Sequence, residues 1–148
     1  MDFTGEQRIP TPRATVFNAL LNPEVLKKSI PNCQSAEYVD LPNGRYLKLN
    51  ITLNFAILNG SYDVFLQTTD IVEPSHLVYV AEPRSSLGSV SAHCSVDLAE
   101  EGTTTLLSYK ATASLSGKVA AVPELIVKPA VKGMLDQFFK NFDKQVNA

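Results

Sequence analysis

The chain has 148 residues, of which 45% are hydrophobic and 19% are charged, and its formal net charge is −2. These values are typical of one globular domain, here residues 1–148, and the scattered basic residues argue against nucleic acid as a partner. The apolar runs fall short of the roughly 18 residues of a membrane helix, and no secretory signal is apparent. Two cysteines and two histidines do not indicate a zinc site, so a cytoplasmic protein with free thiols is expected.

The first third of the chain predicts a short strand followed by two short helices. Residues 3–9 form the expected strand. Thr11 is predicted to cap the first helix, with Pro12 at its first helical position. The Asn22-Pro23 pair repeats this start signal, and Pro31 should end the second helix because the residue before a proline disfavours helix.

Six further strands are predicted from the alternation of apolar and polar residues. In the second of them, the leucines and isoleucine at odd positions predict one buried face and one wet face. The Phe55-Ala56-Ile57-Leu58 segment that follows is apolar where a loop should be polar, and it is either a bent strand or an exposed lip at a cavity mouth. The expected ranges are 35–41, 45–53, 60–72, 77–82, 89–98 and 103–115.

From Lys118 onward the apolar period becomes that of a helix. Pro129 falls inside this stretch and should kink or divide it. The predicted fold is therefore α+β, with a seven-stranded antiparallel sheet curled around one long C-terminal helix. Small residues on the inner face of the sheet either leave a cavity between the two layers, which is the favoured alternative, or allow the helix to pack close to the sheet. The helix stripe is Val122, Ile126, Ala130, Met134, Phe138, Phe142 and Val146, with Val127, Val131, Leu135 and Phe139 beside it.

Several motifs along the chain resemble those of the CoxG family of carbon monoxide dehydrogenase subunits, which is part of the START-like (SRPBCC, helix-grip) superfamily. The resemblance covers almost the whole chain. Four positions depart from the family pattern: Asn32 replaces the usual glycine, Phe17 replaces the common tryptophan, and Pro123 and Pro129 stand in the last helix where the family tends to have glycine or polar residues. The matching residues are Gly5-Glu6, Pro12, Val16-Phe17, Leu20, Asn22-Pro23, Leu26, Ile30-Pro31, Cys33, the run Gly102 to Ala111, Gly117-Lys118-Val119-Ala120 and Phe138-Phe139.

The resemblance implies a helix-grip fold with a ligand cavity. No cofactor or metal is expected. It also implies an accessory role: handling a hydrophobic, lipid- or quinone-like molecule for a membrane-coupled redox enzyme of the molybdenum type, such as carbon monoxide dehydrogenase, or helping to recruit that enzyme. The protein would then be cytoplasmic or peripheral to the membrane.

The predicted cavity wall combines apolar side chains with a few tyrosines, whose hydroxyl groups either orient a ligand or only complete the core. Catalytic residues are not expected, because the inward positions contain no aspartate or glutamate for acid–base chemistry. The predicted ligand-binding residues are Leu53, Phe55, Tyr62, Val64, Tyr79, Val90, Tyr109, Ala111, Val122 and Ile126.

Two other classes of function stay open at this point. A cyclase- or hydrolase-type enzyme on the same fold predicts a titratable pair inside the cavity, drawn from Asp63, Glu82, His93 and Asp97. An assembly adaptor predicts a filled core without a cavity. Cys33 has no base near it in the sequence, so a structural role is favoured over a reactive thiol.

Overall fold

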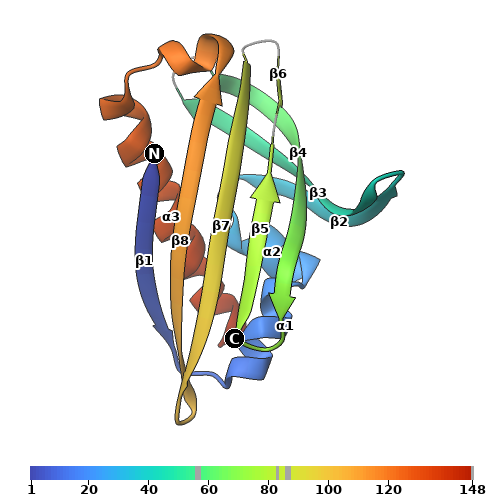
Figure 1. Cartoon of the computed structure of the whole chain (residues 1–148), viewed down its shortest axis with the longest axis vertical. Coiled ribbons are helices and arrows are strands. Elements are labelled where there is room, and N and C mark those ends of the chain that lie inside the picture. The colour runs from blue at the N-terminus through green and yellow to red at the C-terminus, as the bar shows by residue number, and fades with distance from the viewer. Residues whose placement is uncertain (56–57, 83, 86–87, 148) are drawn as a thin grey trace.

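The computed structural model describes residues 1–55, 58–82, 84–85 and 88–147, and for residues 54, 55, 58, 84, 85 and 119 it describes the backbone alone. Within these ranges the chain forms one antiparallel sheet and three α-helices (Figure 1). Seven strands follow the order β1 (Asp2–Ile9), β8 (Thr104–Ser116), β7 (Gly88–Glu101), β5 (His76–Ala81), β4 (Leu58–Val72), β3 (Gly44–Phe55) and β2 (Cys33–Leu41). The predicted fold is confirmed.

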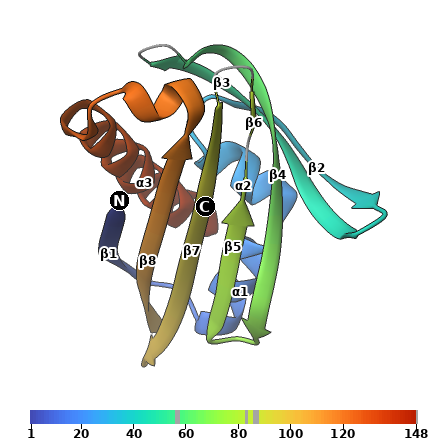
Figure 2. The same ribbon diagram turned by 45° about the horizontal axis from the view of Figure 1, so that its top comes forward.

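The sheet is strongly curved, and the long helix α3 (Glu124–Val146) crosses its concave face (Figure 2). The short helix α2 (Pro23–Ser29) packs against both α3 and β2. A two-residue strand, β6 (Arg84–Ser85), pairs with β7 outside the main strand order, and the sequence did not predict it. Residues 56 and 57, on which the bent-strand and lip alternatives fall, lie outside the described ranges.

The predicted ends of the two short helices between β1 and β2 were confirmed for α2 but not for the start of α1 (Arg13–Leu20). Asn22 caps α2 as predicted, since its Oδ1 accepts a hydrogen bond from the Glu24 amide at 3.0 Å. Helix α2 also ends at Ile30, whose extended backbone precedes Pro31. For α1 the prediction was wrong, because Pro12 is itself the N-cap and no side chain caps the helix.

Thr11 instead connects the start of the chain to its end. Its hydroxyl donates a hydrogen bond to the Oδ1 atom of Asn147, just beyond α3. Its carbonyl accepts a hydrogen bond from the Thr105 hydroxyl at 2.7 Å. Both threonines are buried, so a side chain expected to cap a local helix serves a long-range contact.

The predicted division of the C-terminal helix falls at a different proline. A 3₁₀ turn, η1 (Gly117–Ala121), comes first, and α3 starts after Pro123. Pro123 is the N-cap of α3, where a missing N–H costs nothing. Pro129 lies inside α3, which continues through it, so of the two predicted effects, a kink or a division, the division does not occur.

The fully buried side chains gather toward one end of the sheet. They belong to β1, α1, β5, β7, β8 and the second half of α3, and they include Ile9, Phe17, Leu77, Leu107 and Phe142. A smaller cluster forms around Leu26, Leu47 and Leu49 under α2. The first half of α3 is not covered by comparable large side chains, and the cavity lies there.

Candidate functional site

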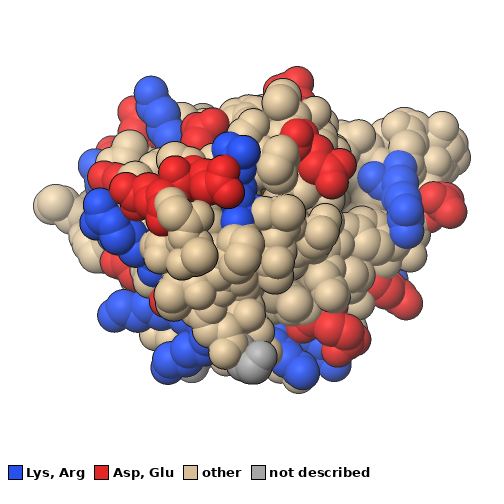
Figure 3. All heavy atoms as spheres, turned by 90° about the horizontal axis from the view of Figure 1, so that it is seen from below, with Lys and Arg blue, Asp and Glu red and all other residues tan. Residues whose placement is uncertain are grey.

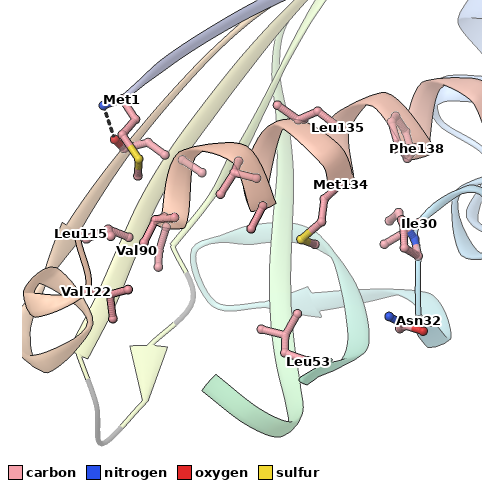
Figure 4. Close-up of a pocket in the computed structure, with 16 residues that line it drawn as sticks. Met1, Ile30, Asn32, Leu53, Val90, Leu115, Val122, Met134, Leu135 and Phe138 are labelled. Carbon is pink, nitrogen blue, oxygen red and sulfur yellow. Dashed lines mark hydrogen bonds between the residues drawn. The ribbon is translucent and has the colours of Figure 1, made fainter. Parts of the chain in front are cut away.

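An apolar cavity of about 580 Å³ lies between the first half of α3 and the concave face of the sheet (Figure 4). This volume is within the range of small-molecule sites. Side chains from both layers form its wall, together with residues from η1–α3 and from the corner after α2. The described lining residues are Met1, Ile30, Pro31, Asn32, Leu53, Val90, Ala92, Ala113, Leu115, Val122, Val127, Ala130, Val131, Met134, Leu135 and Phe138.

Almost all side chains of this wall are apolar. Among the described lining residues, Asn32 alone has a polar side chain, and none has an acidic or basic one. The N-terminal ammonium group of Met1 donates a hydrogen bond to the Ala113 carbonyl at 2.9 Å (Figure 4), so it is engaged with the edge of the sheet. Such a wall offers dispersion contacts and burial to a ligand and no group for acid–base chemistry.

Small side chains on the sheet keep the cavity open. Ala92 on β7 and Ala113 on β8 are direct cross-strand partners, and Ala130 faces them from α3. A smaller cavity of about 160 Å³ shares Ala92, Ala113, Val131 and Leu135 with the first one. Its wall also includes Phe3, Leu66, Tyr79, Ala81, Cys94 and Ala111. The two cavities therefore adjoin and form an outer and an inner compartment.

Five of the ten predicted wall residues line these compartments. Leu53, Val90 and Val122 line the outer one. Tyr79 and Ala111 line the inner one. The side chain of Phe55 lies outside the described part of the chain.

The other four predicted residues lie elsewhere. Val64 packs on the Leu26 cluster. Tyr62 is half-buried, and its hydroxyl donates to the Asn59 carbonyl at 3.5 Å. Ile126 is 53% exposed, because the rotation of the helix by 100° per residue turns Val127 and Val131 toward the cavity and Ile126 away from it. The fourth residue, Tyr109, belongs to the core.

The buried tyrosine hydroxyls are used inside the fold. Tyr79 donates to the Leu20 carbonyl at 2.6 Å, and burial holds its pKa well above the ordinary value. Tyr109 stacks on Phe139 with ring centroids 4.4 Å apart. Its hydroxyl accepts a hydrogen bond from Lys132 Nζ at 3.0 Å. Of the two alternatives left open by the sequence, the core-completing one describes these two residues.

The titratable residues that an enzyme would need inside the cavity lie on the surface. Asp63, Glu82, His93 and Asp97 are all exposed. Asp97 pairs with His76 at 2.7 Å on the outer face of the sheet. His93 adjoins the inner compartment, but it occupies the outward position between Ala92 and Cys94 on β7.

Both cysteines are held in the thiol form by burial. Cys33 starts β2 and packs beside the Leu26 cluster, and its Sγ donates to the Ser35 carbonyl at 3.2 Å. Desolvation raises its pKa. Cys94 faces the inner compartment, where burial raises its pKa to about 12. A thiol with a raised pKa is a poor nucleophile, which supports the structural role predicted for Cys33.

The residues that sequence reasoning missed belong mainly to α3 and to the two ends of the cavity. Val127, Val131 and Leu135 were visible as a stripe beside the expected one, and both stripes contribute residues to the wall. Met1 and the Ile30–Asn32 corner come from segments distant in sequence, and the local pattern contains no signal that places them beside α3.

Comparison with known proteins agrees with this architecture. The model of the CoxG family of carbon monoxide dehydrogenase subunits matches residues 5–147. The chain belongs to the CoxG family. A conserved protein from Geobacillus kaustophilus superposes with a TM-score of 0.87 at 26% identity, covering 99% of this chain and 95% of that one. The fold is START-like, as the next comparison shows.

More distant structures share the fold. A START superfamily protein from Mycobacterium smegmatis gives a TM-score of 0.74 at 14% identity, covering 99% of this chain and 97% of that one. The di-domain ARO/CYC protein StfQ from the steffimycin biosynthetic pathway gives a TM-score of 0.72 at 9% identity, covering 97% of this chain and 49% of that one. No curated protein sequence matches the CoxG-family chain significantly. Among its described residues, no helix has both the length and the apolarity to cross a bilayer.

Proposed function

We propose that this CoxG-family protein is a non-catalytic carrier for a lipid- or quinone-like molecule. The observation that carries the proposal is the apolar cavity of about 580 Å³, with its inner extension of about 160 Å³. Burial of apolar surface is worth about 25 cal/mol per Å², so a hydrocarbon body that fills this space gains several kcal/mol without any directed contact. A wall of this kind binds a ligand by shape and apolarity.

The lack of acidic and basic side chains among the described residues of the cavity wall also supports an accessory, non-enzymatic role. General acid–base catalysis needs a titratable group within hydrogen-bond reach of the reacting atom. The described wall offers one carboxamide and otherwise hydrocarbon and thioether groups. The family takes its name from one of the subunits of carbon monoxide dehydrogenase. We therefore infer that the carried molecule serves a redox enzyme of that kind.

The carrier function is tested by asking what the protein retains from lipids. Purified protein is incubated with vesicles made from extracted bacterial lipids, separated from them, and analysed by native mass spectrometry. We expect a bound species that is released on denaturation and is an uncharged or weakly polar lipid. If the protein emerges as the bare chain after incubation with these vesicles and with added quinone, the carrier function is refuted.

An exposed apolar pair at the start of α3, next in sequence to Val127 of the cavity wall, suggests where the ligand is exchanged. Leu125 and Ile126, in the first turn of α3, are 91% and 53% exposed, and Met134 of the cavity wall is itself 40% exposed. At the opposite end of the molecule, positive and negative side chains surround an uncharged centre (Figure 3). We propose that the Leu125–Ile126 pair touches the membrane surface during exchange.

Replacing both residues of this pair with serine is expected to weaken binding to lipid vesicles by roughly tenfold or more, because each buried side chain of this size is worth about 1.5–3 kcal/mol. Vesicle flotation with the purified protein measures this. A matched control is the double variant Ile71→Ser, Val72→Ser, which removes an equally adjacent exposed pair, 51% and 57% exposed, from the far end of β4. Equal loss in both variants would contradict a specific contact at α3.

A further inference from the structure

We propose that the Asn32 carboxamide selects a ligand that has a neutral, hydrogen-bond-accepting head group, and holds that head at the edge of the cavity. This inference rests on the carrier function proposed above and makes it more specific. Among the described lining residues, Asn32 alone offers a polar side chain. It lies beside Ile30, at the edge formed by the corner after α2, and it is exposed, so the site is at the rim (Figure 4).

The backbone fixes the position of this side chain. The Asn32 carbonyl accepts hydrogen bonds from the Thr52 amide at 3.0 Å and from Gln34 Nε2 at 3.5 Å. The Cys33 amide donates to the Ile30 carbonyl at 3.3 Å. These hydrogen bonds join the corner to β3 and close its turn. The Asn32 carboxamide itself forms no hydrogen bond with a described residue.

The backbone conformation at position 32 would suit glycine better than asparagine. Asn32 has a φ of 59°, in the left-handed region that glycine adopts at the lowest cost. Asparagine tolerates this region better than most residues, but it still carries a steric cost that glycine does not. The corner therefore does not need a side chain for its shape, and a carboxamide at the rim is available for another purpose.

The chemistry of the wall decides which way a ligand with one polar end must lie. A carbonyl or hydroxyl group placed against the hydrocarbon wall would lose its hydrogen bonds to water without replacement, at a cost of about 1–3 kcal/mol. Beside Asn32 the same carbonyl or hydroxyl group accepts a hydrogen bond from the carboxamide N–H and stays in contact with water. The apolar body then points past Leu135 toward the inner compartment around Tyr79.

A neutral head fits the site better than a charged one. No lysine or arginine belongs to the described lining, and the Met1 ammonium group, on the side away from Asn32, is bonded to the Ala113 carbonyl (Figure 4). A carboxamide donates and accepts hydrogen bonds without charge. The ligand class that matches is an apolar molecule with a carbonyl-bearing or hydroxyl-bearing end.

The test compares two probes of similar shape, decyl-1,4-benzoquinone and decylbenzene, in displacing the dye Nile red from the purified protein. The wild-type protein should bind the quinone more tightly. In Asn32→Gly, which should fold because glycine suits this φ, quinone affinity should fall roughly three- to tenfold, the worth of one hydrogen bond, and decylbenzene affinity should stay unchanged. Asn32→Asp keeps the shape but removes the N–H donor, and it should lose quinone affinity as well.

The outcomes separate this inference from the function on which it rests. If both probes displace the dye but their affinity ratio is the same in wild type, Asn32→Gly and Asn32→Asp, the role of Asn32 is refuted and the carrier function stands. If neither probe displaces the dye from the wild-type protein, the carrier function itself fails. A circular dichroism spectrum and a melting curve for each variant confirm that the comparison is made between folded proteins.

Discussion

Replacing Ala113 with phenylalanine is expected to reduce the affinity for an apolar ligand by at least about tenfold, or about 1.4 kcal/mol. Ala113 lines both compartments, so a ring added there occupies the passage between them. The fold should tolerate the change, because the new side chain enters existing space instead of displacing packed atoms. The measurement is displacement of an apolar dye, together with a thermal melt of the same sample.

The matched control for this prediction is Ala99→Phe. Ala99 is on β7, next to β8 in the sheet, but it is exposed and lines neither compartment. The Ala99→Phe variant should bind the ligand as tightly as the wild-type protein does. A second filling variant, Ala92→Phe, tests the cross-strand partner of Ala113 and should repeat its loss. Unchanged affinity in both filling variants would show that the ligand binds somewhere else.

Truncating Phe17 to alanine is expected to destabilise the protein by about 3–5 kcal/mol, the usual cost of removing a buried aromatic side chain. Phe17 is only 2% exposed and belongs to the main hydrophobic cluster. For a chain of this length, each kcal/mol lowers the melting temperature by roughly 2–4 °C, so a fall of about 6–20 °C is expected. Urea unfolding followed by circular dichroism measures the free energy directly.

Phe65→Ala serves as the comparison, since Phe65 is 38% exposed and its ring meets Tyr46 edge-on at 6.5 Å. Its truncation should cost less than about 1 kcal/mol. Phe17 does not line either compartment, so the folded Phe17→Ala protein should keep its affinity for an apolar dye well below its melting temperature. A loss of stability no larger than that of Phe65→Ala would contradict the position assigned to Phe17 in the core.

Much of the fold could be predicted from local signals alone. The alternation from Leu47 to Leu53 identified β3 and its inner face, because a half-buried strand repeats every two residues. Asn22 and Pro31 identified the two ends of α2, because capping and the restriction before proline act within a few residues. Signals of this kind need no knowledge of the rest of the chain.

The errors occurred where a distant contact decided the outcome. Thr11 looks like a helix cap, but its partners are Asn147 and Thr105, which are more than 90 positions away. Tyr109 looks like a wall residue, but Phe139 and Lys132 hold its ring and its hydroxyl. No local pattern announces such pairings, because they depend on how strands and helix meet in space.

The cavity wall could be predicted only in part for a related reason. A helix advances 100° per residue, so a stripe with a spacing of four residues drifts by about 40° around the helix at each step. Ala130, Met134 and Phe138 of the predicted stripe line the cavity, whereas Ile126 lies on the surface and its neighbour Val127 faces inward. On the strands the period of two left little room for such an error, and Leu53, Val90 and Ala111 were placed on the correct face.

The separation of the filled end from the hollow end has a consequence for how the molecule can change. Phe17, Leu77 and Leu107 hold the fold from one end and take no part in the wall. Substitutions at distant sites add nearly independently, so changes at Leu53, Val90 or Val122 should reshape the cavity without lowering the stability held elsewhere. The specificity of the cavity can therefore change, in evolution or by design, while the scaffold stays the same.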